Sequence, residues 1–263
     1  SATAERVEDI GRYVRRICFD DAFQGRIMAD FAFKDLALKK VAIVSISDCA
    51  YCQSLRVSFR EKFIQNGGSI IADETILSND TSFEKLVTAL KSKGEIDCIF
   101  VPNYERTAAR LLPQLIDAGI KPKAWIAGDG WGSTLSLFHR LMGKRDYLAY
   151  GIAHWRPEVS RTESKNFYQK FKTKFDNIEP NDTAVLTYDA IRIVLKALLN
   201  TKETTRDALM TEIEKIESFD GASGEIVYAS GKRTPSKPAV LVRMKNLGLS
   251  VERLISESKA TKP

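Results

Sequence analysis

The chain has 263 residues, 44% of them hydrophobic, which is enough for one large domain or two ordinary ones around a buried core. Its 40 basic and 34 acidic residues give a formal net charge of +6. No dense basic run is interleaved with aromatic residues, so the pattern favours a mildly basic, solvated surface over a nucleic-acid-binding face. No segment approaches the roughly 18 apolar residues of a membrane-spanning helix.

Strand-like and helix-like patterns alternate from residue 40 to residue 153. Apolar, β-branched runs such as KVAIVSI predict strands at 40–46, 69–76, 97–102, 124–127 and 147–153. Amphipathic segments predict helices at 51–66, 81–92, 105–118 and 134–142, the second of them capped by Ser82 or Asp80. Strands joined by helical crossovers predict a mostly parallel sheet covered on both faces, with ligands at the carboxyl ends of its strands.

The pattern changes after residue 160. Three helices are predicted in succession, at 162–175, 183–200 and 205–216, and short strands follow at 224–228, 239–244 and 251–254. The middle helix has a broad apolar face, which must pack against a sheet. Either these helices cover the first sheet, or their own sheet is missing from this chain.

Two of the four cysteines, Cys49 and Cys52, have the spacing of a redox dithiol or of half a zinc site. A zinc site needs two further nitrogen or sulfur ligands. The sequence favours two ordinary thiols or one local disulfide, and no metal or cofactor is predicted. Cys18 and Cys98 lie in apolar runs.

The segment WIAGDGWGS, at 125–133, places one acid and one indole among three glycines at the end of a predicted strand. Glycine permits close approach of the backbone to a ligand. The acid, Asp129, either receives a positively charged group or caps a helix beginning near Ser133. Trp131 either lines a pocket or belongs to the core.

Several segments together resemble a known family. They are SATA (1–4), YVRRICFDDAFQG (13–25), KKVAIV (39–44), DCAYCQSL (48–55), PNYERTAARLLPQLIDAGI (102–120), GDGWGS (128–133), TYDAI (187–191) and FDGASGEIVY (219–228). The chain resembles the substrate-binding proteins of branched-chain amino-acid ABC transporters, the leucine/isoleucine/valine-binding type of periplasmic binding protein.

The resemblance implies an α/β fold of two lobes joined by three crossovers, apparently lacking most of the N-terminal lobe. Residues 17–152 would form a complete lobe with a doubly wound, mostly parallel sheet. Residues 1–16 would be a crossover segment, and 153–220 would be the helical remainder of the truncated lobe. Residues 221–263 would hold a crossover and C-terminal strands that return to the first sheet. The helices at 160–216 would then be exposed and open to self-association.

The resemblance also implies a site for an amino-acid-like solute. Asp129 matches the family's acid for the ligand ammonium, and Asp21 is a second candidate that otherwise caps a helix beginning near Phe23. Tyr51 and Tyr104 match aromatic residues that close over the ligand, or are ordinary surface or hinge tyrosines. Ser1 and Thr3 match the segment that binds the ligand carboxylate. Trp131 would form part of the pocket wall. His154 and Trp155 would belong to a hinge rather than contact the ligand.

The function implied is capture of a solute outside the cytoplasm and its delivery to a membrane permease by closure of two lobes. A ligand-sensing domain of a receptor with the same fold is the alternative. With half of the carboxylate site absent, binding by this chain would be impaired. No catalytic motif is found in the sequence, so an enzyme is not predicted. The location implied is periplasmic or at the extracellular surface, with the export signal not in this chain.

Overall fold

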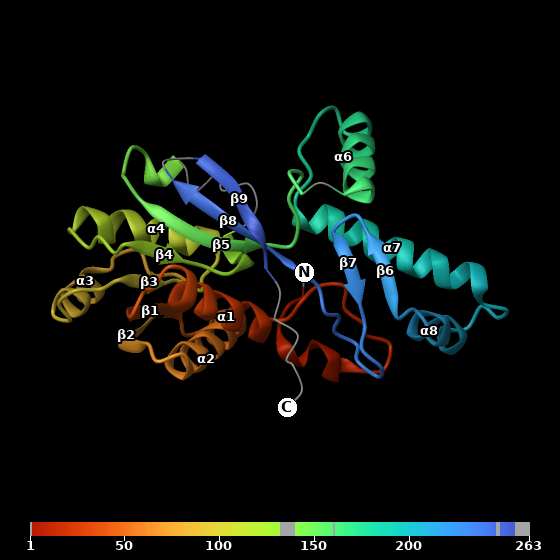
Figure 1. Ribbon diagram of the computed structural model, residues 1–263, viewed down its shortest axis with the longest axis horizontal. Coiled ribbons are helices and arrows are strands. Elements are labelled where there is room, and N and C mark those ends of the chain that lie inside the picture. Colours follow the sequence, from red (N-terminus) through yellow and green to blue (C-terminus); the bar gives the residue numbers. More distant parts are fainter. Residues whose placement is uncertain (1, 132–139, 160, 246–247, 256–263) are drawn as a thin grey trace. The chain divides into compact units, whose positions relative to one another are not determined.

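The computed structural model describes residues 2–131, 140–159, 161–245 and 248–255, which form two compact units (Figure 1). Unit 1 comprises Ser1–Asp20 and His154–Val240, and unit 2 comprises Asp21–Ala153 and Leu241–Pro263. The chain therefore passes between the units three times. The expected helix at 134–142 falls largely outside the described residues, and so do Ser1 and Ser133.

Unit 2 is built on a sheet of seven strands, in the order β2-β1-β3-β4-β5-β8-β9. The strands are β1 (Lys40–Ile46), β2 (Ser69–Ile76), β3 (Cys98–Phe100), β4 (Ala124–Ile126), β5 (Leu148–Ala153), β8 (Ala239–Lys245) and β9 (Gly248–Ile255). The pairs β1–β2, β1–β3, β3–β4 and β4–β5 are parallel. β1, β3 and β4 are almost completely buried, as expected of parallel strands covered on both faces.

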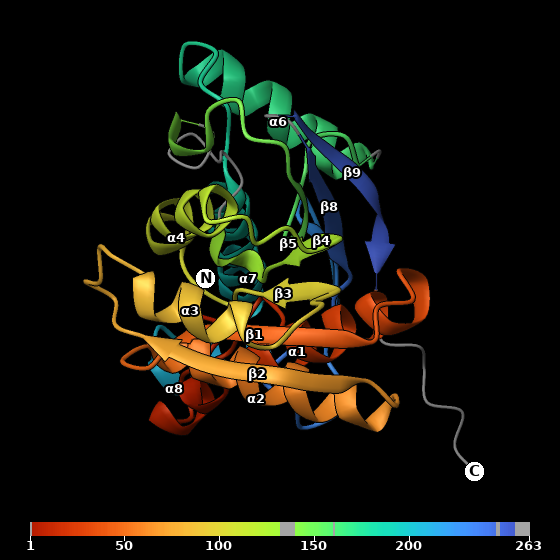
Figure 2. The same cartoon turned by 90° about the vertical axis from the view of Figure 1, so that its left-hand side faces the viewer.

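Helices cover both faces of this sheet. Figures 1 and 2 show α1 and α2 together on one face and α3 and α4 on the other. Their bounds are α1 (Asp21–Asp30), followed by a π-helical turn η2 (Phe31–Asp35), α2 (Ala50–Gln65), α3 (Glu84–Lys91) and α4 (Glu105–Asp117). The predicted fold class, a periplasmic-binding-protein-like α/β fold with a mostly parallel sheet, is confirmed for this unit.

The predicted cap of α3 is wrong. The residue before the helix is Phe83, whose side chain makes no capping hydrogen bond. Phe83 is 2% exposed, so burial of its ring fixes where the helix begins. The Asp80 carboxylate instead accepts the backbone N–H of Leu77 at 2.8 Å, as part of the turn before the helix.

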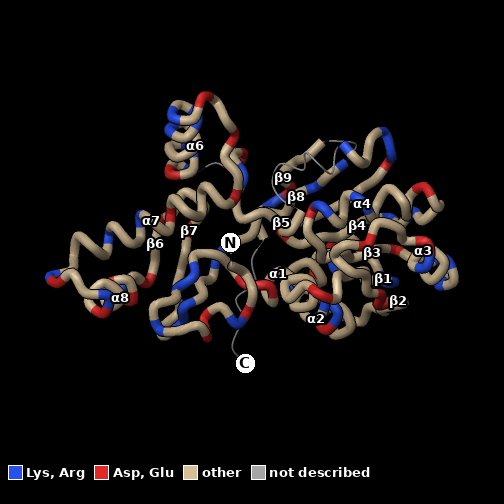
Figure 3. Tube along the Cα trace, turned by 180° about the vertical axis from the view of Figure 1, so that it is seen from behind, with Lys and Arg blue, Asp and Glu red and all other residues tan. Residues whose placement is uncertain are grey.

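Unit 1 is mainly helical. It contains a 3-10 helix η1 (Glu5–Ile10), α6 (Thr162–Lys174), α7 (Asp182–Asn200), α8 (Arg206–Glu214) and an antiparallel pair of strands, β6 (Ser218–Gly221) and β7 (Gly224–Val227). Two apolar clusters hold it together. One is centred on Ile193, Phe219 and Ile226, and the other on Trp155, Phe167 and Val185. Acidic and basic residues are interspersed along both units (Figure 3).

A buried acid connects two segments of unit 1. Asp189 of α7 is 0% exposed and accepts the backbone N–H groups of Ala222 and Ser223, each at 2.8 Å. The Ser223 hydroxyl in turn accepts a hydrogen bond from the Lys237 ammonium at 2.6 Å. Lys237 is 2% exposed, and this burial lowers its pKa to about 8. The segments TYDAI and FDGASG are thus parts of one polar cluster.

Candidate functional site

The candidate site lies at the carboxyl ends of the central strands of unit 2. The strand order reverses direction between β1 and β3, because β2 lies on one side of this pair and β4 on the other. Ligands of open α/β sheets bind at such a switch point. Tyr51 follows β1, Tyr104 follows β3 and Asp129 follows β4. Asp21 begins α1 of the same unit.

Tyr51 is the centre of this group. Its hydroxyl accepts the backbone N–H of Gly130 at 2.8 Å and also interacts with the Asp129 carboxylate. Its ring stacks on Tyr104, with centroids 5.0 Å apart and an interplanar angle of 22°. Tyr51 is 7% exposed, whereas Tyr104 is 53% exposed. The two rings therefore form an aromatic wall with one buried and one accessible side.

The two acids act on both tyrosines. The pKa of Tyr51 is well above its usual value, first because the phenol is buried and then because the charges of Asp129 and Asp21 oppose its ionisation. The pKa of Tyr104 is raised by burial and by the same two carboxylates. Asp21 and Asp129 thus lie within electrostatic reach of both tyrosines, and contact of these residues with a ligand stays a prediction. This arrangement attracts a cationic group and disfavours an anionic one.

The glycines of the Asp129 loop make room for Tyr51. A Cβ atom on Gly128 would lie 2.6 Å from the Tyr51 hydroxyl oxygen. One on Gly130 would lie 2.9 Å from the same oxygen. Real Cβ atoms essentially never approach other heavy atoms so closely. The glycines therefore let the loop backbone close on the tyrosine, a contact that the sequence did not reveal.

Two amide side chains that the sequence analysis did not single out fix the site. Gln24 of α1 is 0% exposed, and its Oε1 accepts the backbone N–H of Asp129 at 3.0 Å. Asn103 is also 0% exposed and joins the end of β3 to the end of β1. Its Oδ1 accepts the N–H of Ile46 at 3.0 Å, and its Nδ2 donates to the carbonyl of Val44 at 3.3 Å. The only signal for them was their place in the segments DDAFQG and PNYER.

The other predicted site residues that the structure describes are Trp131 and Thr3. Trp131 is 2% exposed, on a short 3-10 helix η3 (Asp129–Trp131) that packs against α4 and β5. Thr3 belongs to unit 1, where its carbonyl accepts a hydrogen bond from Arg16 at 2.9 Å. Their contact with a ligand stays a prediction.

His154 and Trp155, which were predicted to belong to a hinge, are the first two residues of the second segment of unit 1. The His154 ring stacks on Phe19 with centroids 4.1 Å apart, and the backbone N–H of His154 donates to the Asp182 carboxylate. The Trp155 indole donates to the Ser164 hydroxyl at 2.6 Å.

Cys49 and Cys52 form a disulfide at the start of α2, with Cα atoms 5.2 Å apart. Of the alternatives that the sequence left open, the local disulfide is therefore the one found. Within the described residues, no group of three or more His, Cys, Asp or Glu side chains is placed to hold a metal ion. The same part of the chain contains no helix with the length and hydrophobicity needed to cross a membrane.

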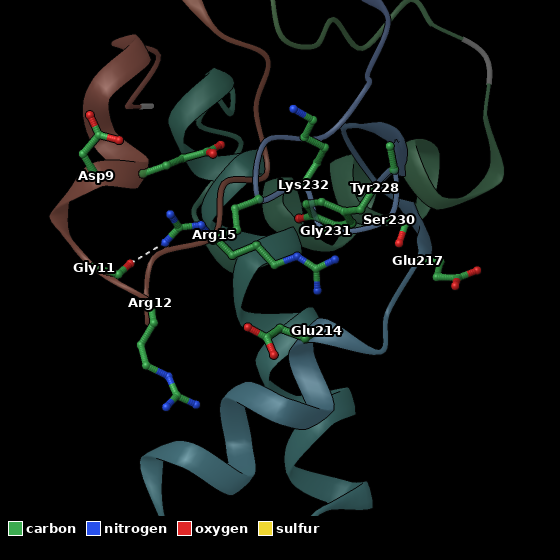
Figure 4. Close-up of a pocket in the computed structure, with 13 residues that line it drawn as sticks. Asp9, Gly11, Arg12, Arg15, Glu214, Glu217, Tyr228, Ser230, Gly231 and Lys232 are labelled. Carbon is green, nitrogen blue, oxygen red and sulfur yellow. Dashed lines mark hydrogen bonds between the residues drawn. The ribbon is translucent and has the colours of Figure 1, made fainter.

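A separate cavity of about 590 Å³ lies within unit 1 (Figure 4). Charged side chains of both signs line it, among them Arg12, Lys232, Glu214 and Glu217. The Arg15 guanidinium lies over the Tyr228 ring, 3.6 Å from its centroid. This cavity shares no residue with the group around Tyr51.

The doubly wound α/β unit thus has polar and aromatic side chains gathered at the carboxyl ends of its strands, the place where ligands of such sheets bind. The sequence profile of the family described as periplasmic binding protein matches residues 2–248, and the chain belongs to this family.

Known relatives carry names of the same kind. The chain is 25% identical over 218 residues to Leu/Ile/Val-binding protein homolog 3 of Brucella melitensis. The aligned region covers 82% of this chain and 57% of that protein. It is 29% identical over 121 residues to the Leu/Ile/Val-binding protein BraC3 of Rhizobium johnstonii, covering 46% of this chain and 32% of that protein. The matches thus span about half, and about a third, of the length of these curated relatives.

Solved structures agree. The leucine-binding protein LivK of Thermotoga maritima has a TM-score of 0.81 and 28% identity, over 94% of this chain and 69% of that one. The branched-chain amino acid transporter substrate-binding protein LivJ of Streptococcus pneumoniae, in complex with isoleucine, has a TM-score of 0.85 and 26% identity, over 97% of this chain and 71% of that one. These names denote binding proteins and not enzymes.

Proposed function

We propose that this chain is the solute-binding component, or a part of it, of an ABC transporter, and that its ligand is an amino acid or a similar small amine. The proposal places the ligand ammonium near Asp129 and Asp21, with the rings of Tyr51 and Tyr104 beside it. The observation that carries it is the pairing of two carboxylates with two stacked tyrosines at the switch point of the sheet. The names of the relatives support a branched-chain amino acid.

The role proposed is reversible capture without catalysis, followed by delivery to a membrane permease. Location in the periplasm or on the extracellular surface follows from the same role. A disulfide at Cys49–Cys52 supports this location, because disulfides persist in oxidising compartments.

We expect this chain to bind its ligand weakly. The described residues named above around Tyr51 supply partners for an ammonium, and none of them is a basic side chain for a ligand carboxylate. In the proposed mechanism the second lobe completes the site. A ligand held on one side only has a dissociation constant on the order of 1 mM, or about −4 kcal/mol.

The apolar face of α7 supports the idea that more structure covers unit 1. Ile191, Leu195 and Leu199 are all at least 53% exposed on this helix. Exposed apolar patches of this kind mark interaction sites. We expect this face to pack against α/β structure corresponding to the part of the relatives that this chain does not match. Light scattering tests the competing expectation of self-association, since Leu195→Glu would dissociate a dimer formed through this face.

An NMR titration tests the ligand. Binding of L-leucine at millimolar concentration is expected to shift signals of unit 2, whereas benzoate is not, because benzoate has no ammonium and meets two carboxylates. Asp129→Asn is expected to abolish the response to L-leucine. The matched control is Asp146→Asn, which makes the same change of charge at an exposed acid of the same unit. Equal L-leucine binding by both variants would remove Asp129 from the site.

A further inference from the structure

The disulfide Cys49–Cys52 encloses one of the site residues. Only Ala50 and Tyr51 lie between the two cysteines, and both belong to the first turn of α2. The cross-link therefore restrains the backbone from which the Tyr51 side chain projects. The Tyr51 hydroxyl accepts the backbone N–H of Gly130 and interacts with the Asp129 carboxylate, and the Tyr51 ring stacks on Tyr104. A local covalent bond thus restrains a contact with a loop far away in the sequence.

The two cysteine residues differ in exposure. Cys49 precedes the helix and is partly exposed, whereas Cys52 is 0% exposed. The Cys49 sulfur also accepts the backbone N–H of Cys52 at 3.1 Å, so it occupies the capping position of α2. A thiolate at this position is stabilised by the N-terminal end of the helix. An external thiolate can reach Cys49, and the helix stabilises the thiolate that Cys49 forms on reduction.

We propose that Cys49–Cys52 is a thiol–disulfide exchange site for an external dithiol, and that its oxidation state sets the ligand affinity of the site around Tyr51. The effect on affinity rests on the proposed function, whereas the exchange reaction and the release of Tyr51 do not.

The exchange proceeds in two displacements. A thiolate of the dithiol attacks the Cys49 sulfur, a mixed disulfide forms, and Cys52 leaves as a thiolate that takes up a proton. The second thiol of the dithiol then attacks the dithiol sulfur that is bonded to Cys49, and Cys49 is released. Two electrons and two protons pass to the protein, and the dithiol becomes a disulfide.

Reduction removes the cross-link but not the helix. The carbonyl of Cys49 still accepts the N–H of Gln53, and the Gln53 amide still donates to the carbonyl of Ile46. The first turn then keeps these bonds but loses the covalent restraint, and Tyr51 gains freedom to leave Gly130. The reduced protein is expected to bind the ligand about fivefold more weakly, the effect of losing one net hydrogen bond.

Alkylation followed by mass spectrometry tests the exchange. Dithiothreitol is the dithiol probe, and the folded protein is expected to gain label at Cys49 and Cys52 first. Cys18 and Cys98 are buried thiols outside this disulfide, so their labelling reports unfolding and serves as an internal control. If the disulfide resists dithiothreitol until Cys18 and Cys98 also react, the exchange site is disproved.

Amide hydrogen exchange tests the coupling without any ligand. The Gly130 amide is expected to exchange faster after reduction and in the double variant Cys49→Ser/Cys52→Ser, which keeps a good capping residue at position 49. Dithiothreitol added to the double variant is the control and should change nothing. Equal Gly130 exchange in the oxidised, reduced and double-variant proteins would overturn the coupling.

L-Leucine titration of the same samples tests the affinity. A fivefold rise of the dissociation constant on reduction supports the proposal, and equal values contradict it. Absence of L-leucine binding by the oxidised protein counts against the proposed ligand, and the Gly130 amide then decides the coupling alone.

Discussion

The hydroxyl oxygen of Tyr51 accepts the backbone N–H of Gly130 at 2.8 Å, across 79 positions of sequence. This bond joins the first turn of α2, which follows β1, to the short 3-10 helix η3, which follows β4. It depends on the absence of side chains at Gly128 and Gly130, where a Cβ atom would collide with the tyrosine. Four predictions follow from this contact and from the buried charges of the two units.

Gly128→Ala is expected to destabilise the protein by about 1–3 kcal/mol, because the added methyl group meets both Leu55 and the Tyr51 hydroxyl. The free energy of unfolding, measured by urea denaturation, checks this. Tyr51→Phe in the same background removes one of the two collisions and should recover part of the loss. A wild-type unfolding midpoint for Gly128→Ala alone would mean that the loop does not close on Tyr51.

Asp97→Asn is expected to remove a pH-dependent stabilisation of unit 2. Burial opposes ionisation of this carboxyl, but bonds from Lys123 and from the N–H groups of Lys39 and Lys40 lower its pKa to about 2. Because the folded-state pKa is below the unfolded value, the stabilisation is present above pH 4 or so and is lost as the pH falls through about 2. It amounts to about 2 kcal/mol.

Urea denaturation of wild type and Asp97→Asn at a series of pH values measures this. The difference between the two proteins should shrink on acidification. A difference that stays constant from neutral pH to about pH 2 contradicts the assignment.

Lys237→Met tests the buried ammonium of unit 1. The folded-state pKa of Lys237 is about 8, below the ordinary value of 10.5, so the unfolded chain binds more protons between these values. Wild-type stability relative to Lys237→Met should therefore rise with pH, by about 2.5 kcal/mol between about pH 7 and about pH 10. Chemical denaturation of both proteins at the two pH values measures this difference in the free energy of unfolding. A difference that falls with pH would show that the folded protein stabilises the Lys237 ammonium.

Asp189→Asn is expected to cost about 2–4 kcal/mol, because the Ala222 and Ser223 N–H groups bind different carboxylate oxygens. Asparagine replaces one of these oxygens with an NH2 donor and leaves a buried N–H without its acceptor. Thermal denaturation measures the loss. Asp220→Asn is the matched control, since this acid is 68% exposed and pairs only at the surface. Similar losses in the two variants would contradict a special role for Asp189.

The sheet of unit 2 could be predicted closely from the sequence. The predicted bounds 40–46 and 69–76 are those of β1 and β2. β1 is a buried apolar run with abrupt ends, as expected of a parallel strand covered on both faces. β6 was not predicted as a strand, because SFDG has a single large apolar residue and its pairing with β7 provides the missing signal. The start of α3 was misplaced because burial of Phe83, not a polar cap, determines it.

The site could be predicted in part. The rule for strand ends brings Tyr51, Tyr104 and Asp129 to one edge of the sheet, and the structure confirms this grouping. The bonds that fix the grouping could not be predicted. The contact of Gln24 with Asp129 spans 105 positions, and that of Asn103 with Ile46 spans 57. Such contacts depend on how helices pack on the sheet, which no local pattern encodes.

The carboxylate of Asp189 fills the space above Gly221, where any Cβ atom would lie 2.5 Å from its Oδ2 atom. Substituting the glycine alone creates a clash, and shortening the acid alone exposes two amide groups to a void. Evolution can therefore exchange these two residues only together. Across a set of aligned homologues, the two columns should covary, although 32 positions separate them in the sequence. A deep alignment would show this without any experiment on the protein.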